Sequence, residues 1–403
     1  MFRSVSSTRL ALRVLSCGLA LQFVFGMAYA WGAVAPYVRL HDHWSPLLIS
    51  AVFSGTPLGY GMGIIIGGWF ADRSPPRRLC WIGTGLLLIG FAVAFLLPSG
   101  ITFAIFYSAL ALGLGGSIAL AGALAAGISA FPGREGMIGG TLTGSYALAA
   151  VVQIPVISYL ASTIGWADAL RLVGSIMALL AVAMVLLMPA VPRLAHPQQT
   201  TGAVSFLQLM RRKQVWTGFF LEITASPLGA YAFATIATYA HSLSLALWVA
   251  TVAVIAVAVG NALGRIVAGA ASDRFGVNRV FLVILALNLL AVILLLVPGN
   301  GMTVLLAALA AGIGFGGPAG LLSRLASASA SDAPNTAFGL LFFGYALGVF
   351  AGPLLGAATG GNIRSWFVLG SLAGIGLFVL IIREVLARSR PERAAHGKRE
   401  SFH

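Results

Sequence analysis

Long apolar segments separated by short polar stretches run through almost the whole chain. A helix needs about 17 to 25 apolar residues to cross the hydrocarbon core of a bilayer. Twelve segments meet this length, near residues 14–36, 46–70, 79–98, 101–127, 136–160, 167–189, 215–240, 245–271, 280–298, 302–323, 336–360 and 366–382. The pattern predicts an all-α membrane protein with twelve transmembrane helices.

The first segment also resembles a secretory signal, because Arg3, Arg9 and Arg13 precede it. It is longer than a signal core and has no clean cleavage region before Pro36, so we interpret it as the first spanning helix. The longest internal polar stretch lies between the sixth and seventh segments. It divides the chain into a six-helix bundle at 1–190, a linker at 191–214, a second six-helix bundle at 215–385 and a basic tail at 386–403.

The composition supports membrane insertion. Hydrophobic residues make up 59% of the chain and charged residues 8%, and the mean hydropathy is +0.97. A soluble domain carries about 25% charged residues. The net charge of +14 would suit a nucleic-acid partner, but the arginines lie in short loops and at the termini, which membrane topology explains better. We therefore expect a lipid bilayer and no nucleic acid as partner.

The loop charges predict the orientation. Twenty of the 24 Lys and Arg residues fall on the side that carries both termini, and three fall on the other, namely Arg39, Arg171 and Arg364. The positive-inside rule therefore places both termini in the cytoplasm. The excess of Arg over Lys is typical of a GC-rich bacterial genome, so we expect a multi-pass protein of the bacterial inner membrane. We also expect the protein to be a monomer.

The two halves repeat at an offset of 201 residues. Gly68, Asp72 and Arg73 correspond to Gly269, Asp273 and Arg274, and Gly113, Gly115 and Gly116 correspond to Gly314, Gly316 and Gly317. Parallel six-helix repeats are a transporter architecture with the substrate near the midplane, between the halves.

Two helices carry glycine at every fourth position, which aligns the glycines on one helix face. The sets are Gly55, Gly59, Gly63 and Gly67, and Gly344, Gly348, Gly352, Gly356 and Gly360. One interpretation is ordinary tight packing. The other is a sliding contact where the two halves move past each other.

Residues 67–78 (GGWFADRSPPRR) and 269–279 (GAASDRFGVNR) resemble the loop motif of the major facilitator superfamily. The resemblance covers nearly the whole chain and implies the fold of that family: two pseudo-symmetric bundles of six helices that alternate between two open states. In the first copy Ser74, Pro75 and Pro76 replace the usual residues. The predicted gating residues of these loops are Asp72, Arg73, Arg77, Asp273 and Arg274. Asp72 is expected to accept from the amides of a helix N-terminus or from Arg side chains, which would close the cytoplasmic side.

A narrower resemblance is to the oxalate:formate antiporters and monocarboxylate transporters. It rests on residues 28–32 (AYAWG), 261–273 (NALGRIVAGAASD) and 338–353 (FGLLFFGYALGVFAGP). In that branch an Arg of the eighth helix binds the substrate carboxylate, so the resemblance carries this role to Arg265. The antiporters have a Lys where this chain has Tyr345. The monocarboxylate transporters have a Lys near Ala33 and an Asp where this chain has Asn261. A second fixed cation is therefore missing, which favours a monoanion over oxalate.

Two charges lie deep inside predicted spans, Arg265 and Glu222. A guanidinium cannot shed its proton, so it must face protein or a water-filled cavity and find an anionic or polar partner. The two residues are at similar depth on consecutive antiparallel helices. Three arrangements are open: a static ion pair, a substrate carboxylate on Arg265 with Glu222 competing or carrying a coupling proton, or Glu222 facing away and bonded to Thr224 or backbone.

We expect a secondary transporter that moves a small monocarboxylate-like anion by alternating access, coupled to protons. Polar and aromatic candidates to line its cavity with Arg265 and Asn261 are Tyr29, Trp31, Tyr146, Gln153 and Tyr345. We expect no cofactor and no metal site, because no ligand set has the required spacing. No catalytic motif appears, so an enzyme is not expected. The alternatives are a drug or metabolite exporter of the same superfamily and a membrane sensor of small anions that does not transport.

Overall fold

The computed structural model describes residues 5–31, 34, 37–38, 41–44, 46–97, 99–191, 206–297, 300–360 and 363–397, and all elements in this part are helical. The first bundle contains α1 (Val5–Phe25), η1 (Gly26–Ala30), α3 (Pro46–Ala71), α4 (Pro76–Leu96), α5 (Gly100–Thr102), η2 (Phe103–Gly115), α6 (Gly116–Ala130), α7 (Glu135–Ile164) and α8 (Trp166–Leu187). After the short α9 (Phe206–Met210), the second bundle contains α10 (Lys213–Ser242), α11 (Leu247–Phe275), α12 (Val277–Leu296), α13 (Gly301–Ser329), α14 (Pro334–Ala358) and α15 (Ile363–Gly397).

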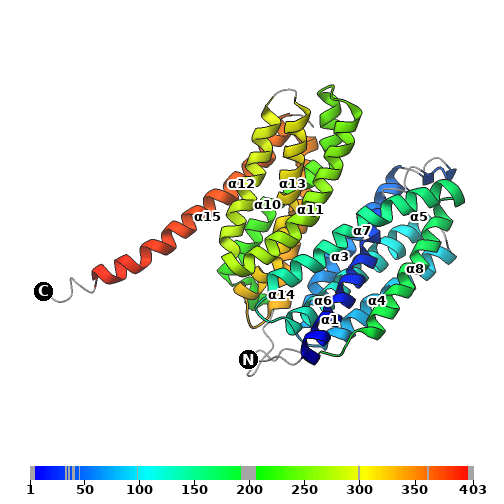
Figure 1. Cartoon of the computed structure of the whole chain (residues 1–403), viewed down its shortest axis with the longest axis horizontal. Helices are drawn as coiled ribbons and strands as arrows, with labels where there is room; N and C mark the ends of the chain where they lie inside the picture. The colour runs from blue at the N-terminus through cyan, green and yellow to red at the C-terminus, as the bar shows by residue number, and fades with distance from the viewer. Residues whose placement is uncertain are drawn as a thin grey trace.

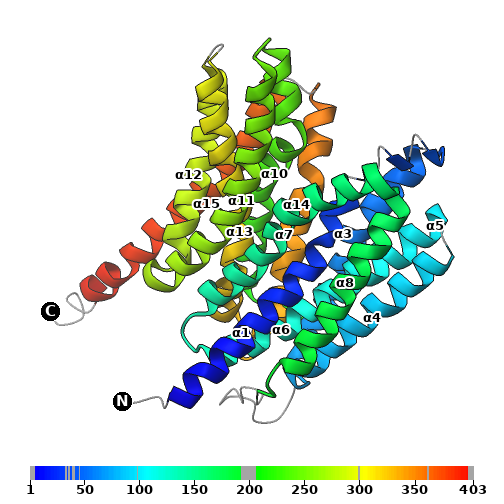
Figure 2. The ribbon, with the colours of Figure 1, turned by 45° about the vertical axis from the view of Figure 1, so that its right-hand side comes forward.

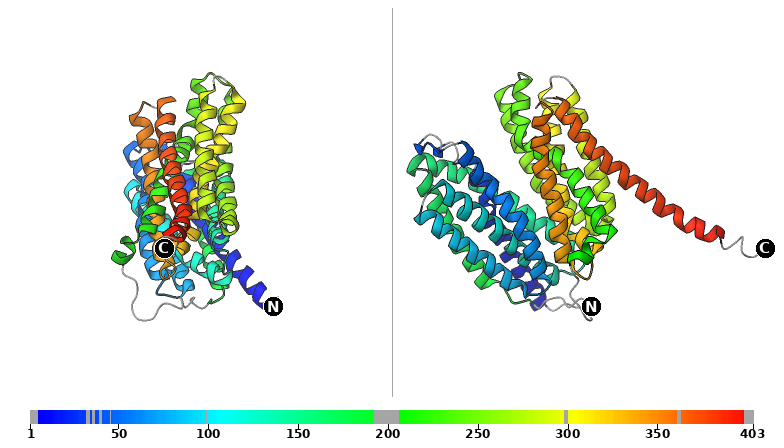
Figure 3. Two further views of the ribbon diagram at one scale, coloured as in Figure 1. Left: turned by 90° about the vertical axis from the view of Figure 1, so that its left-hand side faces the viewer. Right: turned by 180° about the vertical axis from the view of Figure 1, so that it is seen from behind.

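The two bundles touch at one end of the molecule and diverge towards the other, as Figures 1 and 3 show. We call the end where they meet, which carries residues 72–76 and 331–336, the closed end. Helix α7 of the first bundle packs against α11 and α13 of the second, and α3 packs against α14. In Figure 2, α7, α14 and α11 lie in the middle of the molecule between the outer helices of both bundles.

The predicted spans are confirmed. Within the described residues, eleven helices are long and apolar enough to cross a membrane. Helix α3, with 26 residues and no charged side chain, completes the set of twelve. Large apolar side chains are exposed on the outer helices, for example Leu96 (78% exposed) on α4 and Leu179 (72%) on α8. Such a surface suits lipid and would not suit water.

Local sequence sets the helix ends. Pro76 occupies the first turn of α4, where its missing N–H costs nothing. Gly165 and Gly276 separate consecutive helices with φ of +87° and +84°, a conformation that favours glycine. The predicted linker at 191–214 falls largely on residues 192–205, which lie outside the described part.

The last helix departs from its predicted boundary. The spanning part of α15 is Ile363–Val385, but the helix continues through the predicted tail to Gly397. In Figures 1 and 3 this extension projects away from the second bundle.

The glycine stripes serve packing within each bundle. A Cβ on Gly59 would lie 2.0 Å from the carbonyl oxygen of Ala109, in η2 of the same bundle. A Cβ on Gly348 would lie 2.1 Å from Ser226 Oγ, in α10 of the same bundle. The interpretation of these stripes as a sliding contact between the halves is therefore wrong.

We expect Gly59→Ala to destabilise the first bundle by about 1 to 3 kcal/mol, because the added methyl meets backbone that cannot move aside. Gly85→Ala on α4 is the matched control, since no atom lies within 4 Å of its Cβ position. Thermal unfolding in detergent should show a lower midpoint for Gly59→Ala than for the unmodified protein. The midpoint of Gly85→Ala should not be lowered. Equal midpoints for both would contradict the packing role.

Candidate functional site

The guanidinium of Arg265 lies near the middle of α11, inside the protein, with 5% of the residue exposed. Its Nε donates to Asn261 Oδ1 at 3.1 Å, one turn earlier on the same helix. Its Nη2 donates to the hydroxyl of Tyr345 on α14 at 3.3 Å. The Tyr345 hydroxyl in turn donates to the carbonyl of Phe315 at 3.3 Å. The structure thus brings together three of the residues predicted from the sequence.

Aromatic rings extend this site into the first bundle. Tyr29 meets Tyr146 edge to face with ring centroids 5.5 Å apart, and Tyr146 meets Tyr60 at 5.9 Å. Arg265 interacts electrostatically with all three phenols and with that of Tyr345. The cation therefore faces a group of tyrosines from both bundles.

One aromatic contact joins the bundles directly inside the membrane. The ring of Tyr60 on α3 lies 5.3 Å from that of Phe342 on α14, and Phe342 lies 5.6 Å from Tyr345. Neither Tyr60 nor Phe342 was predicted from the sequence. The only available signal was their position: Tyr60 lies between Gly59 and Gly61, and Phe342 lies three residues before Tyr345.

No carboxylate of the described residues forms an ion pair with Arg265. None of the ion pairs in the described part of the chain includes it. Glu222 on α10 is fully buried, and neither of its carboxyl oxygens has a hydrogen-bond partner among the described residues. The static pair of Glu222 with Arg265 is therefore wrong. So is a bond from Glu222 to Thr224, whose hydroxyl donates to the carbonyls of Phe220 and Leu221.

Two predicted lining residues face the interior of the first bundle instead of Arg265. Trp31 packs among the rings of Trp44, Phe103 and Trp166. Gln153 donates through Nε2 to the carbonyl of Phe23 at 2.8 Å, within the same bundle. We therefore correct both assignments to packing and hydrogen bonding inside the first bundle.

The closed end is held by Asp72 at the end of α3. Its carboxylate accepts from both the backbone N–H (3.3 Å) and Nδ2 (2.8 Å) of Asn335, and from the backbone N–H (2.9 Å) and hydroxyl (2.5 Å) of Thr336. These donors form the first turn of α14, where a helix presents unpaired amides and positive partial charge. The predicted contact of Asp72 with a helix N-terminus is therefore present.

Asp273 makes the pseudo-symmetric contact. It accepts from the backbone N–H groups of Gly136 (2.9 Å) and Met137 (2.8 Å) in the first turn of α7. Glycine permits both crossings: a Cβ on Gly68 would lie 2.3 Å from the carbonyl oxygen of Asn335, and one on Gly269 would lie 2.2 Å from that of Gly136. The sequence repeat at an offset of 201 is thus also a repeat of two contacts between the bundles.

The predicted gating arginines act differently. Arg77 donates to the carbonyls of Val185 and Leu186 in its own bundle. Arg73 donates to the carbonyl of Trp69 and lies over its ring, and Arg274 lies over the ring of Phe275. Arg324 crosses between the bundles, paired with Glu135 at 3.0 Å, and also lies near Asp273 at 4.0 Å. Arg324 was not predicted as a gating residue.

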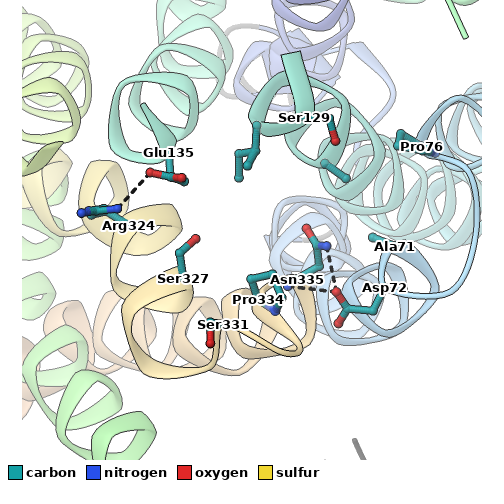
Figure 4. A pocket seen from close by; sticks show the side chains of 12 residues that line it. Ala71, Asp72, Pro76, Ser129, Glu135, Arg324, Ser327, Ser331, Pro334 and Asn335 are labelled. Atoms are coloured by element: carbon teal, nitrogen blue, oxygen red, sulfur yellow. Dashed lines mark hydrogen bonds and ion pairs between the residues drawn. The ribbon is translucent and has the colours of Figure 1, made fainter. Parts of the chain in front are cut away.

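A cavity of about 290 Å³ lies between the bundles at the closed end. Figure 4 shows its walls: Asp72, Ser129 and Glu135 come from the first bundle, and Arg324, Ser327 and Asn335 from the second. The bonds from Asn335 to Asp72 and from Arg324 to Glu135 cross it on two sides.

A bidentate ion pair fixes the loop that leads into α14. Arg212 donates through both terminal nitrogens to the carboxylate oxygens of Asp332 at 2.6 Å. These hydrogen bonds hold the pKa of Asp332 below its usual value and raise the pKa of Arg212. The pair keeps its strength at neutral pH and loses it only as the pH falls through the lowered pKa of Asp332.

Comparison with known proteins gives consistent matches. A family model described as Major Facilitator Superfamily matches residues 16–258 and 223–403. A protein of Escherichia coli K12 described as the uncharacterized MFS-type transporter YhjX is 26% identical over 340 residues, covering 81% of this chain and 83% of the relative.

Solved structures show the same fold at low identity. FucP, an MFS transporter in the outward conformation, has a TM-score of 0.65 at 14% identity and covers 91% of this chain and 97% of its own. The proton:xylose symporter XylE bound to 6-bromo-6-deoxy-D-glucose has a TM-score of 0.69 at 15% identity and covers 92% and 95%. At such identities these likenesses concern the fold alone.

Proposed function

Because the chain belongs to the Major Facilitator Superfamily of membrane transporters, we propose that it carries a small monocarboxylate across the membrane together with a proton. The observation that carries this proposal is the lone guanidinium of Arg265, buried between the two bundles without a carboxylate partner. An uncompensated cation at this depth costs from a few to about ten or more kcal/mol. A substrate of opposite charge would offset that cost each time it binds.

The hydrogen bonds of Arg265 leave part of its guanidinium available to such a substrate. Nε of Arg265 is held by Asn261 and Nη2 touches Tyr345, while Nη1 has no partner among the described residues. A carboxylate can take the terminal edge of the fork, as in bidentate Arg–carboxylate pairs. The hydroxyls of Tyr29, Tyr60 and Tyr146 can then donate to the substrate, and their rings can contain a short carbon chain.

The charge inventory favours a monoanion. Arg265 is the only basic side chain among the buried residues of the described part. A dicarboxylate would bring a second charge to a site without a second cation. We infer the narrower relationship to monocarboxylate transporters from this inventory together with the sequence resemblance.

Glu222 is the proposed carrier of the proton. A carboxylate buried without partners is costly, so the neutral acid suits the observed surroundings. With Glu222 protonated and one anion on Arg265, the loaded site is electrically neutral. The observed state then corresponds to a carrier that has taken its proton and awaits the anion.

The loop charges support an orientation for this state. Under the positive-inside rule the closed end, with Arg73, Arg77, Arg78 and Arg324, faces the cytoplasm. The bundles would therefore diverge towards the outside, in an outward-open carrier of the bacterial inner membrane with both termini inside.

We expect Glu222→Gln to abolish uptake driven by a pH gradient while leaving exchange at equal pH measurable, because Gln keeps the size and loses the proton. Proteoliposomes loaded at alkaline pH, with external radiolabelled lactate or acetate at acidic pH, provide the measurement. Gradient-driven accumulation equal to that of the unmodified protein would contradict the assignment.

The same vesicles separate the alternatives. A thermal-shift screen with formate, acetate, lactate, oxalate and succinate identifies binding, and uptake then identifies transport. Binding without uptake would indicate a sensor. Efflux of lipophilic cations would indicate a drug exporter, which the unpaired positive charge of Arg265 disfavours.

A further inference from the structure

The guanidinium of Arg324, on α13 at the closed end, is only partly used by its contacts. Its Nη1 donates to Glu135 Oε2 on α7 of the first bundle at 3.0 Å, and its Nε lies 4.0 Å from Asp273 Oδ1 within its own bundle. The other terminal nitrogen, Nη2, has no partner among the described residues. The side chain is 37% exposed and borders the cavity of Figure 4. The guanidinium therefore joins the two bundles and still has a donor to offer a ligand.

Ser323, the preceding residue of α13, is covered by the same contact between the bundles. It is 2% exposed, and its hydroxyl has no hydrogen-bond partner among the described residues. It faces Gly139, one turn after Glu135 on α7, since a Cβ on Gly139 would lie 1.8 Å from Ser323 Oγ. Burial of a hydroxyl without a hydrogen bond costs free energy. Separation of α7 from α13 would remove this cost and uncover the hydroxyl next to Arg324.

Arg324 lies close to the proposed substrate site along α13. A Cβ on Gly320 would lie 2.2 Å from the backbone carbonyl oxygen of Arg265. Arg324 follows Gly320 by one helical turn, which places it about 6 Å nearer the closed end. Both arginines lie where the second bundle borders the first. Arg324 is therefore beside the route from Arg265 to the water at the closed end.

Opening of the closed end separates Arg324 from Glu135, because the two belong to opposite bundles. Asp273 belongs to the same bundle as Arg324 and can keep the Nε edge, but the terminal edge loses its carboxylate. We propose that this terminal edge and the Ser323 hydroxyl form a second anion site, which receives the substrate carboxylate after it leaves Arg265. The identity of the anion rests on the proposed function.

The second site links release of the substrate to closure of the carrier. Glu135 and the substrate use the same edge of Arg324, so they exclude each other. As the bundles close, Glu135 returns to Arg324 and displaces the carboxylate into the water at the closed end. By reciprocity, an anion on Arg324 opposes closure. A high carboxylate concentration on this side should therefore slow the return of the carrier.

The transport test compares Glu135→Gln with Arg324→Gln. Uptake of radiolabelled lactate or acetate into inside-out membrane vesicles gives KM at the closed-end face, which is cytoplasmic under the positive-inside rule. Both variants remove the ion pair and favour opening of this end, so an arginine that only joins the bundles would lower KM in both. We expect KM to fall in Glu135→Gln, which frees the guanidinium, and to rise about fivefold or more in Arg324→Gln, which removes it.

A binding test needs no transport. Ser327→Cys places a thiol in the cavity, three residues after Arg324 on the same helix face, and both native cysteines are buried. Arg265→Gln removes the central site and Glu135→Gln removes the competing carboxylate. In this purified protein, acetate replacing chloride at constant ionic strength should slow labelling by a water-soluble maleimide about threefold or more. Addition of Arg324→Gln should abolish this protection.

The second site and the proposed function can fail separately. A KM that falls or stays equal in Arg324→Gln overturns the second site, as does a thiol that acetate does not protect or protects without Arg324. Carboxylate transport by a protein whose thiol is not protected leaves the proposed function standing alone. Protection that depends on Arg324, in a protein that transports no carboxylate, supports the anion site and rejects the proposed substrate.

Discussion

Replacing Arg265 with lysine should weaken monocarboxylate uptake by about tenfold to hundredfold while the protein stays folded. Lysine keeps the charge but loses the planar fork, and with it the bond to Asn261 and one of the two bonds to the substrate. Each hydrogen bond to a charged group contributes about 1.5 to 3 kcal/mol, which gives the expected range. Initial rates of uptake into proteoliposomes over a substrate series should show the loss mainly in KM.

The matched control is Arg171→Lys, which changes an exposed arginine paired with Asp168. An exposed pair contributes little, so transport by this variant should equal that of the unmodified protein. Unchanged KM in Arg265→Lys would remove Arg265 from the anion site, and the assignment of the fold would stand.

Replacing Asp72 with asparagine should loosen the closed end. The carboxylate accepts four hydrogen bonds from the first turn of α14, and the amide keeps one acceptor and introduces donors that face donors. A loss of about 1.5 to 3 kcal/mol of charge-assisted bonding shifts the balance of open states about tenfold to hundredfold.

A cysteine in the closed-end cavity can report this shift. Ser129→Cys places a thiol in that cavity, and the native Cys17 and Cys80 are buried. Labelling of the detergent-purified protein by a water-soluble maleimide should accelerate about tenfold or more when Asp72→Asn is added. Addition of Asp168→Asn, which changes an exposed ion pair outside the closed end, should leave the labelling rate unchanged. Equal rates with and without Asp72→Asn would show that the carboxylate does not hold the bundles together.

Much of the fold follows from the sequence because its signals are local. The length of the apolar runs predicted all twelve helices, and the offset of 201 predicted two related halves, to which the structure adds the related contacts of Asp72 and Asp273. Asn261 and Tyr345, predicted to line the cavity with Arg265, both bond to its guanidinium, and their role in binding substrate stays a prediction.

The facing of each helix was harder to predict. In a membrane both the lipid face and the packed face are apolar, so the pattern does not identify which face borders the site. Trp31 lies two residues from Tyr29, about 240° around a 3-10 helix such as η1, and packs within its own bundle. Because of the same ambiguity, we predicted Gln153 to line the cavity and did not predict Tyr60 there. It also left two interpretations of the glycine stripes open.

At the crossing of α7 and α11, one helical turn carries both the proposed substrate-binding side chain and a contact between the two bundles. The side chain of Arg265 faces the tyrosines, while its backbone carbonyl oxygen lies 2.2 Å from the Cβ position of Gly140 on the opposite bundle. A substrate that binds this guanidinium therefore acts directly on the contact between α7 and α11, where the two bundles must separate. No long relay through the protein is needed, because the residue that binds the substrate also belongs to the contact between the bundles.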